Sequence, residues 1–121
     1  MALHNETGKQ GEVAAANLLR SKGFEVLVTN YRFQKAEIDI IATLQGTVVF
    51  VEVKTRSSEK FGFPEEAVHK KKQQLMALAA AHFMEEHKLS GEIRFDVISV
   101  YKTPHHLHLH HIEDAFFPIA E

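Results

Sequence analysis

The sequence predicts an α/β protein in which a mixed central sheet is flanked by helices. Three observations support this fold class. Helical periodicity occurs in two separate segments, alternating or β-branched segments lie between and after them, and 121 residues suit one compact domain spanning residues 1–121. Hydrophobic residues make up 45% of the chain, which is enough for a packed core and excludes a disordered chain. The predicted order is α-β-β-β-α-β, with a further polar strand near the end.

The first element is a short amphipathic helix over residues 8–22. Val13, Ala16 and Leu19 recur at helical spacing between polar residues. Thr7 is placed to cap the start of this helix, and Gly23 suits the left-handed residue that often ends one. Residues 24–31 are rich in β-branched and aromatic side chains, so we expect a strand there.

Two further strands are expected over residues 36–42 and 47–54. The turn Gln45-Gly46 separates them and predicts an antiparallel hairpin. The second strand has little polar face, which favours a central position in the sheet. The first alternates, so its side chains divide between two faces. One face carries Glu37, Asp39 and Ile41, and the other carries Ile38, Ile40 and Ala42.

A long helix is expected over residues 65–87. Gly62 and Pro64 precede it, and proline suits a first helical turn. Its predicted buried stripe consists of Val68, Leu75, Leu78, Ala79 and Phe83. Alternation then predicts a strand over residues 92–101 and a polar strand over residues 107–112.

Composition excludes several classes of function. Fourteen basic against sixteen acidic residues give a net charge of -2, so the chain is not a uniformly basic binder. The absence of cysteine excludes zinc fingers, thiolate nucleophiles and iron–sulfur ligation. The N-terminus has no secretory h-region, and every apolar run is far shorter than the ~20 residues of a membrane span. We therefore expect a cytoplasmic protein with no membrane partner.

The main chemical signal is carried by the two strands of the predicted hairpin. Glu52 and Lys54 are two residues apart and so share a strand face. The hairpin register can bring Asp39 close to Glu52. Two carboxylates in that arrangement form an oxygen site suited to Mg²⁺ or Mn²⁺, and a neighbouring ammonium can stabilise charge on a phosphate.

The simpler alternative is a solvated strand face with a surface salt bridge. Two observations favour a functional site instead. The strand around Glu52 is too apolar for an exposed edge, so a lone carboxylate there would be costly. Asp39 lies mid-strand between isoleucines, although aspartate is disfavoured in strands.

The separated acid followed by Glu-x-Lys resembles the signature of the PD-(D/E)XK nuclease superfamily. More closely, the chain resembles the YraN-like family of small bacterial proteins, which are similar to archaeal Holliday junction resolvases. The resemblance implies a restriction-endonuclease-like αβββαβ core. It extends from about residue 8 to residue 100, and Ala36 stands where the family usually has glycine. The matching stretches are GKQGE (8–12), NYR (30–32), AEID (36–39), FVEVKTR (50–56), GFP (62–64) and RFDV (94–97).

The resemblance also implies roles for individual residues. Asp39 and Glu52 would hold a divalent metal, Mg²⁺ or Mn²⁺, and Glu12 on the first helix would join them. Lys54 would contact the scissile phosphate or position the attacking water. The implied activity is metal-dependent hydrolysis of phosphodiester bonds in DNA, including branched or junction DNA. Asp96, in contrast, is interpreted as a structural anchor of its strand.

Basic residues cluster next to the predicted site. Between residues 54 and 72 there are six basic residues against three acids, which can follow a phosphate backbone in a mildly acidic chain. We assign nucleic-acid contacts to Arg32, Lys35, Arg56 and Lys72, of which Lys72 matches a basic position of the family. The similarity to resolvases also implies a homodimer.

Two alternatives remain open from the sequence. One is a nuclease-fold module that binds nucleic acid without cutting it. The other is a histidine-based metal-binding protein, because five of the nine histidines cluster near the C-terminus. We prefer to interpret that cluster as a solvent-facing edge strand. Its members are His105, His106, His108, His110 and His111.

Overall fold

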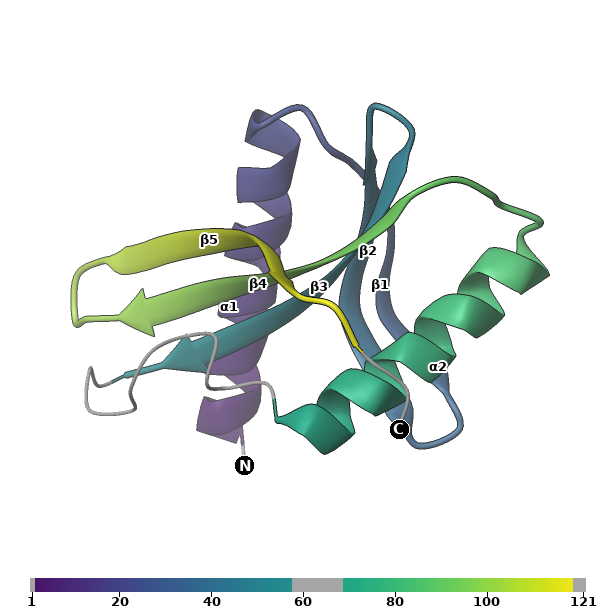
Figure 1. Cartoon of the computed structure of the whole chain (residues 1–121). Helices are drawn as coiled ribbons and strands as arrows, with labels where there is room; N and C mark the ends of the chain where they lie inside the picture. Colours follow the sequence, from purple (N-terminus) through teal and green to yellow (C-terminus); the bar gives the residue numbers. More distant parts are fainter. Residues whose placement is uncertain (1, 58–68, 119–121) are drawn as a thin grey trace.

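The fold is a mixed five-stranded sheet flanked by two helices (Figure 1). The structure is a computed structural model that describes residues 2–57 and 69–118, with side chains from residue 8 onward. This arrangement confirms the predicted fold class and is consistent with a restriction-endonuclease-like core. Its elements are α1 (Ala2–Ser21), β1 (Glu25–Phe33), β2 (Ala36–Leu44), β3 (Thr47–Arg56), α2 (Lys70–Glu86), β4 (Ile93–Lys102) and β5 (Leu107–Phe116).

The strands follow the chain order β1-β2-β3-β4-β5 across the sheet. The β2–β3 hairpin turns at Gln45-Gly46 and is antiparallel, as predicted. The pairing of β3 with β4 is parallel, with α2 within the crossover, and all other neighbours are antiparallel. The apolar strand β3 is therefore central, and the histidine-rich strand β5 forms one edge.

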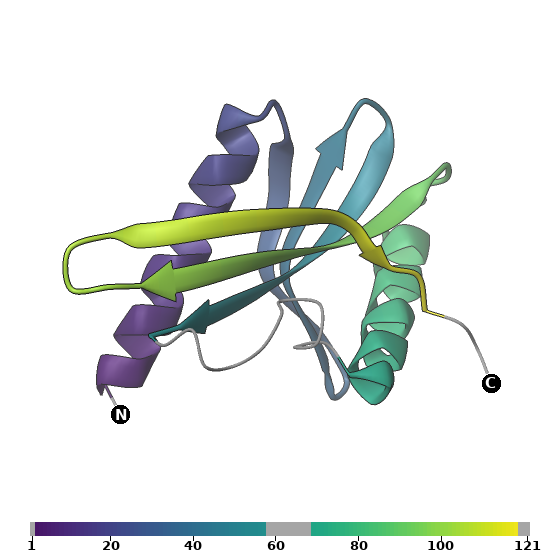
Figure 2. The ribbon, with the colours of Figure 1, turned by 60° about the vertical axis from the view of Figure 1, so that its left-hand side comes forward.

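The two helices cover opposite faces of the sheet (Figure 2). On one face, α1 packs Ala15 and Leu19 against side chains such as Val49 and Val51 of β3. On the other face, α2 packs Met76 and Phe83 against a second set of buried residues. That set includes Ile38, Ile41, Phe50 and Phe95. Within the described residues, no helix is long and apolar enough to cross a membrane.

Several predicted helix features differ from the structure. Helix α1 begins at Ala2, so Thr7 lies within it and does not cap it, whereas Gly23 follows α1 with a φ of 94°, as predicted. The predicted start of the second helix, with Gly62, Pro64 and Val68, lies outside the described residues. Leu78 was expected in the buried stripe but is 55% exposed. The stripe that packs on the sheet runs through Met76, Ala79, Ala80 and Phe83, and Leu78 lies to one side of it.

The predicted alternation of β2 is wrong at Ile38. Ile40 and Ala42 pack on the α1 side as expected, but Ile38 packs on the α2 side together with Ile41. The break falls between Ile38 and Ile40, where β2 stops pairing with β3. Strands β1, β2, β3 and β5 also continue beyond their predicted C-terminal ends.

Asp96 anchors three elements through a buried polar network. Its fully buried carboxylate accepts two hydrogen bonds of 2.9 Å from Arg94 and one from the backbone N–H of Asp114 in β5. His111 Nε2 lies 2.7 Å from Asp96 Oδ2, and Lys22, next to the end of α1, lies 2.6 Å from His111 Nδ1. Since the lysine ammonium can only donate, Nδ1 accepts and Nε2 donates to Asp96.

This network also determines the ionisation of Asp96. Burial by itself would raise the pKa of the Asp96 carboxyl, but the hydrogen bonds from His111 and Arg94 outweigh burial and lower it. Asp96 is thus a satisfied buried anion, in agreement with its predicted structural role. The network explains why β5 continues well beyond residue 112.

We predict that Asp96→Ala lowers the free energy of unfolding by about 3–5 kcal/mol at neutral pH, because it leaves a guanidinium and an imidazole without their buried partner. Urea denaturation measures this difference. Glu92→Ala, at an exposed acid beside the same strand, should change it by less than about 0.5 kcal/mol. Because the pKa of Asp96 is lowered, its contribution is complete above about pH 4 and is lost as pH falls through the native pKa. A difference that stayed constant into strong acid would contradict this assignment.

Candidate active site where the sheet divides

The sheet divides at the point where β2 and β3 stop pairing. Their ladder extends from Leu44↔Thr47 to Ile40↔Val51. Beyond it, β2 pairs only with β1 and β3 pairs only with β4, so the two halves diverge (Figure 1). Asp39 and Glu52 are the first residues beyond the ladder, and the same register places them opposite each other. We call this point of divergence, where Asp39 of β2 and Glu52 of β3 follow the last pair Ile40↔Val51, the fork. The predicted proximity of the two carboxylates arises there.

The side chain of Asp39 replaces the backbone acceptor that β2 no longer offers to β3 beyond the ladder. Its Oδ2 accepts a hydrogen bond of 2.7 Å from the backbone N–H of Val53. The carboxylate thereby satisfies an amide that has lost its neighbouring strand. This bond holds the Asp39 side chain against β3, directly beside Glu52.

Glu52 is buried and forms a short ion pair with α2. Only 4% of its side chain is exposed, and its Oε2 lies 2.6 Å from Lys72 Nζ. Burial alone would lower the pKa of Lys72, but the hydrogen bond to Glu52 and the charges of Glu52 and Asp39 raise it instead. Lys72 is therefore a cation in direct contact with the Glu52 carboxylate.

Asp39 carries the strongest electrostatic perturbation of the site. Burial and then the charge of Glu52 raise the pKa of Asp39 to about 8, even though the Val53 amide and Lys72 act in the opposite direction. Close to neutral pH, the isolated site therefore holds a proton on its carboxylates. A further cation at this position would favour release of that proton.

Glu12 approaches the same cluster from α1. Burial, together with the charges of Glu37 and Glu52, raises its pKa, while a hydrogen bond with Asn30 partly offsets this effect. The helix can come this close because Gly11 lies against β3, where an added Cβ would overlap the Thr55 hydroxyl. The sequence contains this signal as the glycine that immediately precedes Glu12.

The other predicted residues surround the fork at different distances. Lys54 lies two residues beyond Glu52 on β3 and makes no ion pair within the described residues. Arg32 is 3.6 Å from Glu37, and Lys35 is exposed where β1 turns into β2. Arg56 lies at the end of β3, on the other arm of the fork. Sequence reasoning placed Lys72 among the nucleic-acid contacts and did not detect its pairing with Glu52, which depends on how α2 docks.

The donors at the fork are compatible with a hard divalent cation. They are carboxylate oxygens, and Mg²⁺ commonly uses one or two of these together with water. Among the described side chains, those of residues 8–57 and 69–118, no three acidic or histidine residues form a preassembled metal cage. The histidine cluster therefore gives no ligand set within this part of the chain. Burial, and then the charge of Glu52, raises the pKa of Asp39, so the carboxylate pair is not fully compensated by Lys72.

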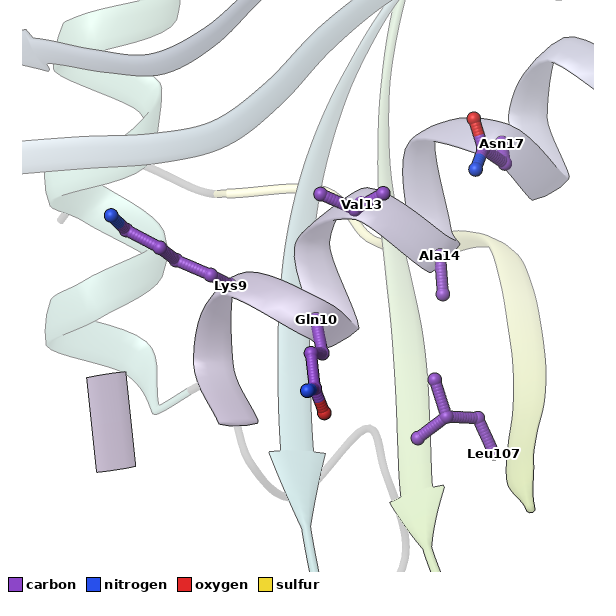
Figure 3. Close-up of a pocket in the computed structure, with 6 residues that line it drawn as sticks. All are labelled: Lys9, Gln10, Val13, Ala14, Asn17 and Leu107. Atoms are coloured by element: carbon purple, nitrogen blue, oxygen red, sulfur yellow. The ribbon is translucent and has the colours of Figure 1, made fainter. Parts of the chain in front are cut away.

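A cavity of about 410 Å³ lies elsewhere, between α1 and the start of β5 (Figure 3). Ala14 and Leu107 point toward each other across it, and its lining is mostly apolar. It shares no residue with the fork. Its lining residues are Lys9, Gln10, Val13, Ala14, Asn17 and Leu107.

The fold and the fork together define a small α/β protein with a restriction-endonuclease-like core and a carboxylate–lysine cluster. Residues 11–100 match the model of the "Uncharacterised protein family UPF0102". The chain therefore belongs to the UPF0102 family, which is the YraN-like family.

Similar proteins cover almost the whole chain. The UPF0102 protein of Christiangramia forsetii is 48% identical over 117 residues, covering 97% of this chain and 98% of the relative. The UPF0102 protein of Flavobacterium psychrophilum shows the same identity and coverage. The UPF0102 protein of Alkaliphilus oremlandii is 41% identical and covers 94% of this chain and 100% of its own length.

We predict that the stability of the protein without divalent metal falls as pH rises from about 4 to about 8. The native pKa of Asp39 exceeds its unfolded value, so the folded state binds the extra proton across this interval. Asp39→Asn should remove most of this dependence and raise the free energy of unfolding at about pH 8 by about 1 kcal/mol, the order of one pKa unit.

Urea denaturation in EDTA over the pH series measures both effects. Glu37→Gln is the matched control, because Glu37 lies on the same strand but pairs with Arg32 at the edge of the cluster. It should retain the wild-type pH dependence. If Asp39→Asn lost stability at about pH 8, the account of this carboxylate would be wrong.

Proposed function

We propose that this protein is a metal-dependent nuclease that hydrolyses phosphodiester bonds in DNA and prefers branched substrates. The observation that carries the proposal is the pair Asp39 and Glu52, which face each other at the fork with lysines beside them. The resemblance of their sequence context to PD-(D/E)XK nucleases and archaeal junction resolvases supports the same activity.

Asp39 and Glu52 are the proposed ligands of Mg²⁺ or Mn²⁺, and Glu12 is positioned to join them. Support comes from the raised pKa values of Asp39 and Glu12, whose causes include the charges of neighbouring acids. A bound divalent ion would supply a water of lowered pKa and would neutralise charge on the phosphate.

Lys72 and Lys54 have different proposed roles at the fork. Lys72 neutralises Glu52 while the carboxylates lack other positive charge. With a divalent ion held by Asp39 and Glu52, Lys72 would be available to interact with the phosphate. Lys54, on the same strand face as Glu52, would contact the scissile phosphate and orient the attacking water.

Basic residues on both arms of the fork support a nucleic-acid substrate. Arg32 and Lys35 lie on the β1–β2 arm, and Arg56 lies on the β3–β4 arm. Backbone contacts of this kind position a duplex without reading its sequence. A homodimer would present two such forks to the two-fold symmetry of a DNA junction, and we include it in the proposal.

We predict that the purified protein cuts four-way-junction DNA in Mg²⁺ or Mn²⁺. Glu52→Gln and Asp39→Asn should each reduce the rate by at least ~100-fold, because they remove charge from the proposed metal ligands. Lys54→Met and Lys72→Met should also reduce it. The measurement is single-turnover cleavage of labelled junction, linear duplex and single-stranded DNA, with Glu92→Gln as a surface control that should retain wild-type activity.

Two results would overturn the proposal. Binding to every substrate without cleavage would favour the alternative of a catalytically silent binding module. Cleavage by Glu52→Gln and Asp39→Asn at the wild-type rate would place the active site elsewhere. Since Asp39→Asn is expected to be at least as stable as wild type, unfolding would not explain a loss of its activity.

A further inference from the structure

A polar surface continues from the fork across β3, β4 and β5. The strand register places three residues in each of two neighbouring rows. In the first row, Lys54 lies beside Ser99, which lies beside His110. In the second row, Arg56 lies beside Tyr101, which lies beside His108. We call these six residues the β3–β5 surface.

All six residues lie on the same face of the sheet as Glu52. Paired residues on adjacent strands share a face, and residues two apart along a strand return to it. Phe50 and Phe95 fix the identity of this face, because they pair with each other and pack in the core on the α2 side. Tyr101 and His108 show the contact directly, with ring centroids 6.0 Å apart.

No helix packs over the β3–β5 surface among the described elements. Helix α2 lies mainly on β1 and β2 and reaches β3 and β4 only around Phe50, Glu52 and Phe95, and the β4–β5 hairpin extends well beyond α2 in Figure 1. His108 and His110 are exposed, whereas Lys54, Ser99 and Tyr101 are partly exposed. His111 and Leu109 alternate with them and point to the opposite face, where they pack under α1.

The chemistry of the β3–β5 surface is one-sided. Lys54 and Arg56 are cationic, Ser99 and Tyr101 carry hydroxyl groups, and the two histidines carry imidazoles. Beyond Glu52, none of the residues that the register places in these rows is acidic. Hydroxyl, ammonium, guanidinium and imidazole groups are the usual ligands of phosphate and sugar oxygens in protein–DNA contacts.

We propose that the β3–β5 surface binds the sugar–phosphate backbone of a DNA strand that leads away from the fork. This inference rests on the proposed function, because it gives the substrate a path from the carboxylates along β3 to the edge strand. The same groups recognise phosphate in any sequence, so the path is independent of base identity. The exposed histidines on β5 then belong to substrate binding.

The two imidazoles give this surface a pH dependence. Histidine changes charge near neutral pH, and protonated His108 and His110 would add positive charge next to DNA. The groups that face them are Ser99 and Tyr101 from β4, with Lys54 and Arg56 one strand further away and His106 beside His108. Apart from Glu52 at the fork, no carboxylate shares these rows.

We expect DNA to bind about 10-fold more tightly at about pH 6 than at about pH 8, a range in which histidine gains charge. Fluorescence anisotropy with labelled single-stranded DNA and four-way-junction DNA in EDTA measures binding in the absence of cleavage. The double variant His108→Gln/His110→Gln should lose most of this gain. Lys54→Gln should weaken binding at both pH values and reduce the slope of log K against log salt by about 1.

Matched controls lie off the β3–β5 surface. His87→Gln alters an exposed histidine after α2 and should retain the pH dependence. Lys102→Gln alters a lysine of β4 that points to the other face and binds Gln10, so it should retain the salt slope. In NMR spectra of the wild-type protein, the ring signals of His108 and His110 should shift on addition of DNA more than those of His87.

The outcomes separate this inference from the proposed nuclease activity. If the protein binds DNA with the expected histidine and salt dependence but cuts nothing, the surface assignment holds and the nuclease proposal fails. If the protein cuts DNA while the double variant and Lys54→Gln bind as wild type does, the surface assignment is wrong. Equal losses of DNA binding in His87→Gln and Lys102→Gln would also overturn it. They would show that DNA is attracted to any positive charge on the protein and not to this surface. The NMR shifts decide the case in which the double variant is unfolded.

Discussion

The hydrogen bond from the Val53 amide to the Asp39 carboxylate is the interaction on which the candidate site depends. A sheet that simply continued its β2–β3 ladder would bury both residues in ordinary strand pairs. Here the ladder stops at Ile40↔Val51, and Asp39 provides the acceptor that the backbone of β2 no longer offers. The free-energy cost of opening the sheet is thereby limited, because the Val53 amide keeps a hydrogen-bond acceptor. The same bond directs the carboxylate toward Glu52.

Opening the sheet brings buried carboxylates together, and their repulsion is only partly offset by Lys72. Asp39 and Glu52 approach each other in partly or fully buried positions, with Glu12 nearby. Lys72 offsets one charge through its contact with Glu52, yet the pKa of Asp39 still rises to about 8. A sequence selected only for stability would replace one of these acids. Because the pKa of Asp39 is raised, the folded state loses stability as pH rises toward 8, and the proposed cation would offset this loss.

The sequence was sufficient to predict features that depend on local pattern. The turn at Gln45-Gly46 fixes the hairpin register, and that register alone places Asp39 opposite Glu52. Features that depend on the docking of α2 could not be predicted in the same way. Ile38 changes face because β2 leaves β3, and Leu78 is exposed because the packed stripe runs through its neighbours. The contact between Lys72 and Glu52 joins residues 20 positions apart and likewise needs the helix in place.

The histidines near the C-terminus show why residue counts alone are ambiguous. As a cluster in the sequence, they suggest a single metal site, but His105 and His106 precede β5, and strand alternation divides His108, His110 and His111 between its two faces. His111 points inward, with 3% of its side chain exposed, and completes the buried network of Asp96. His108 and His110 point outward, in rows that lead back to the fork. The network that holds β5 in register therefore also fixes where the outward histidines lie relative to Lys54 and Glu52. One edge strand thus links a structural anchor on one face to a polar surface on the other.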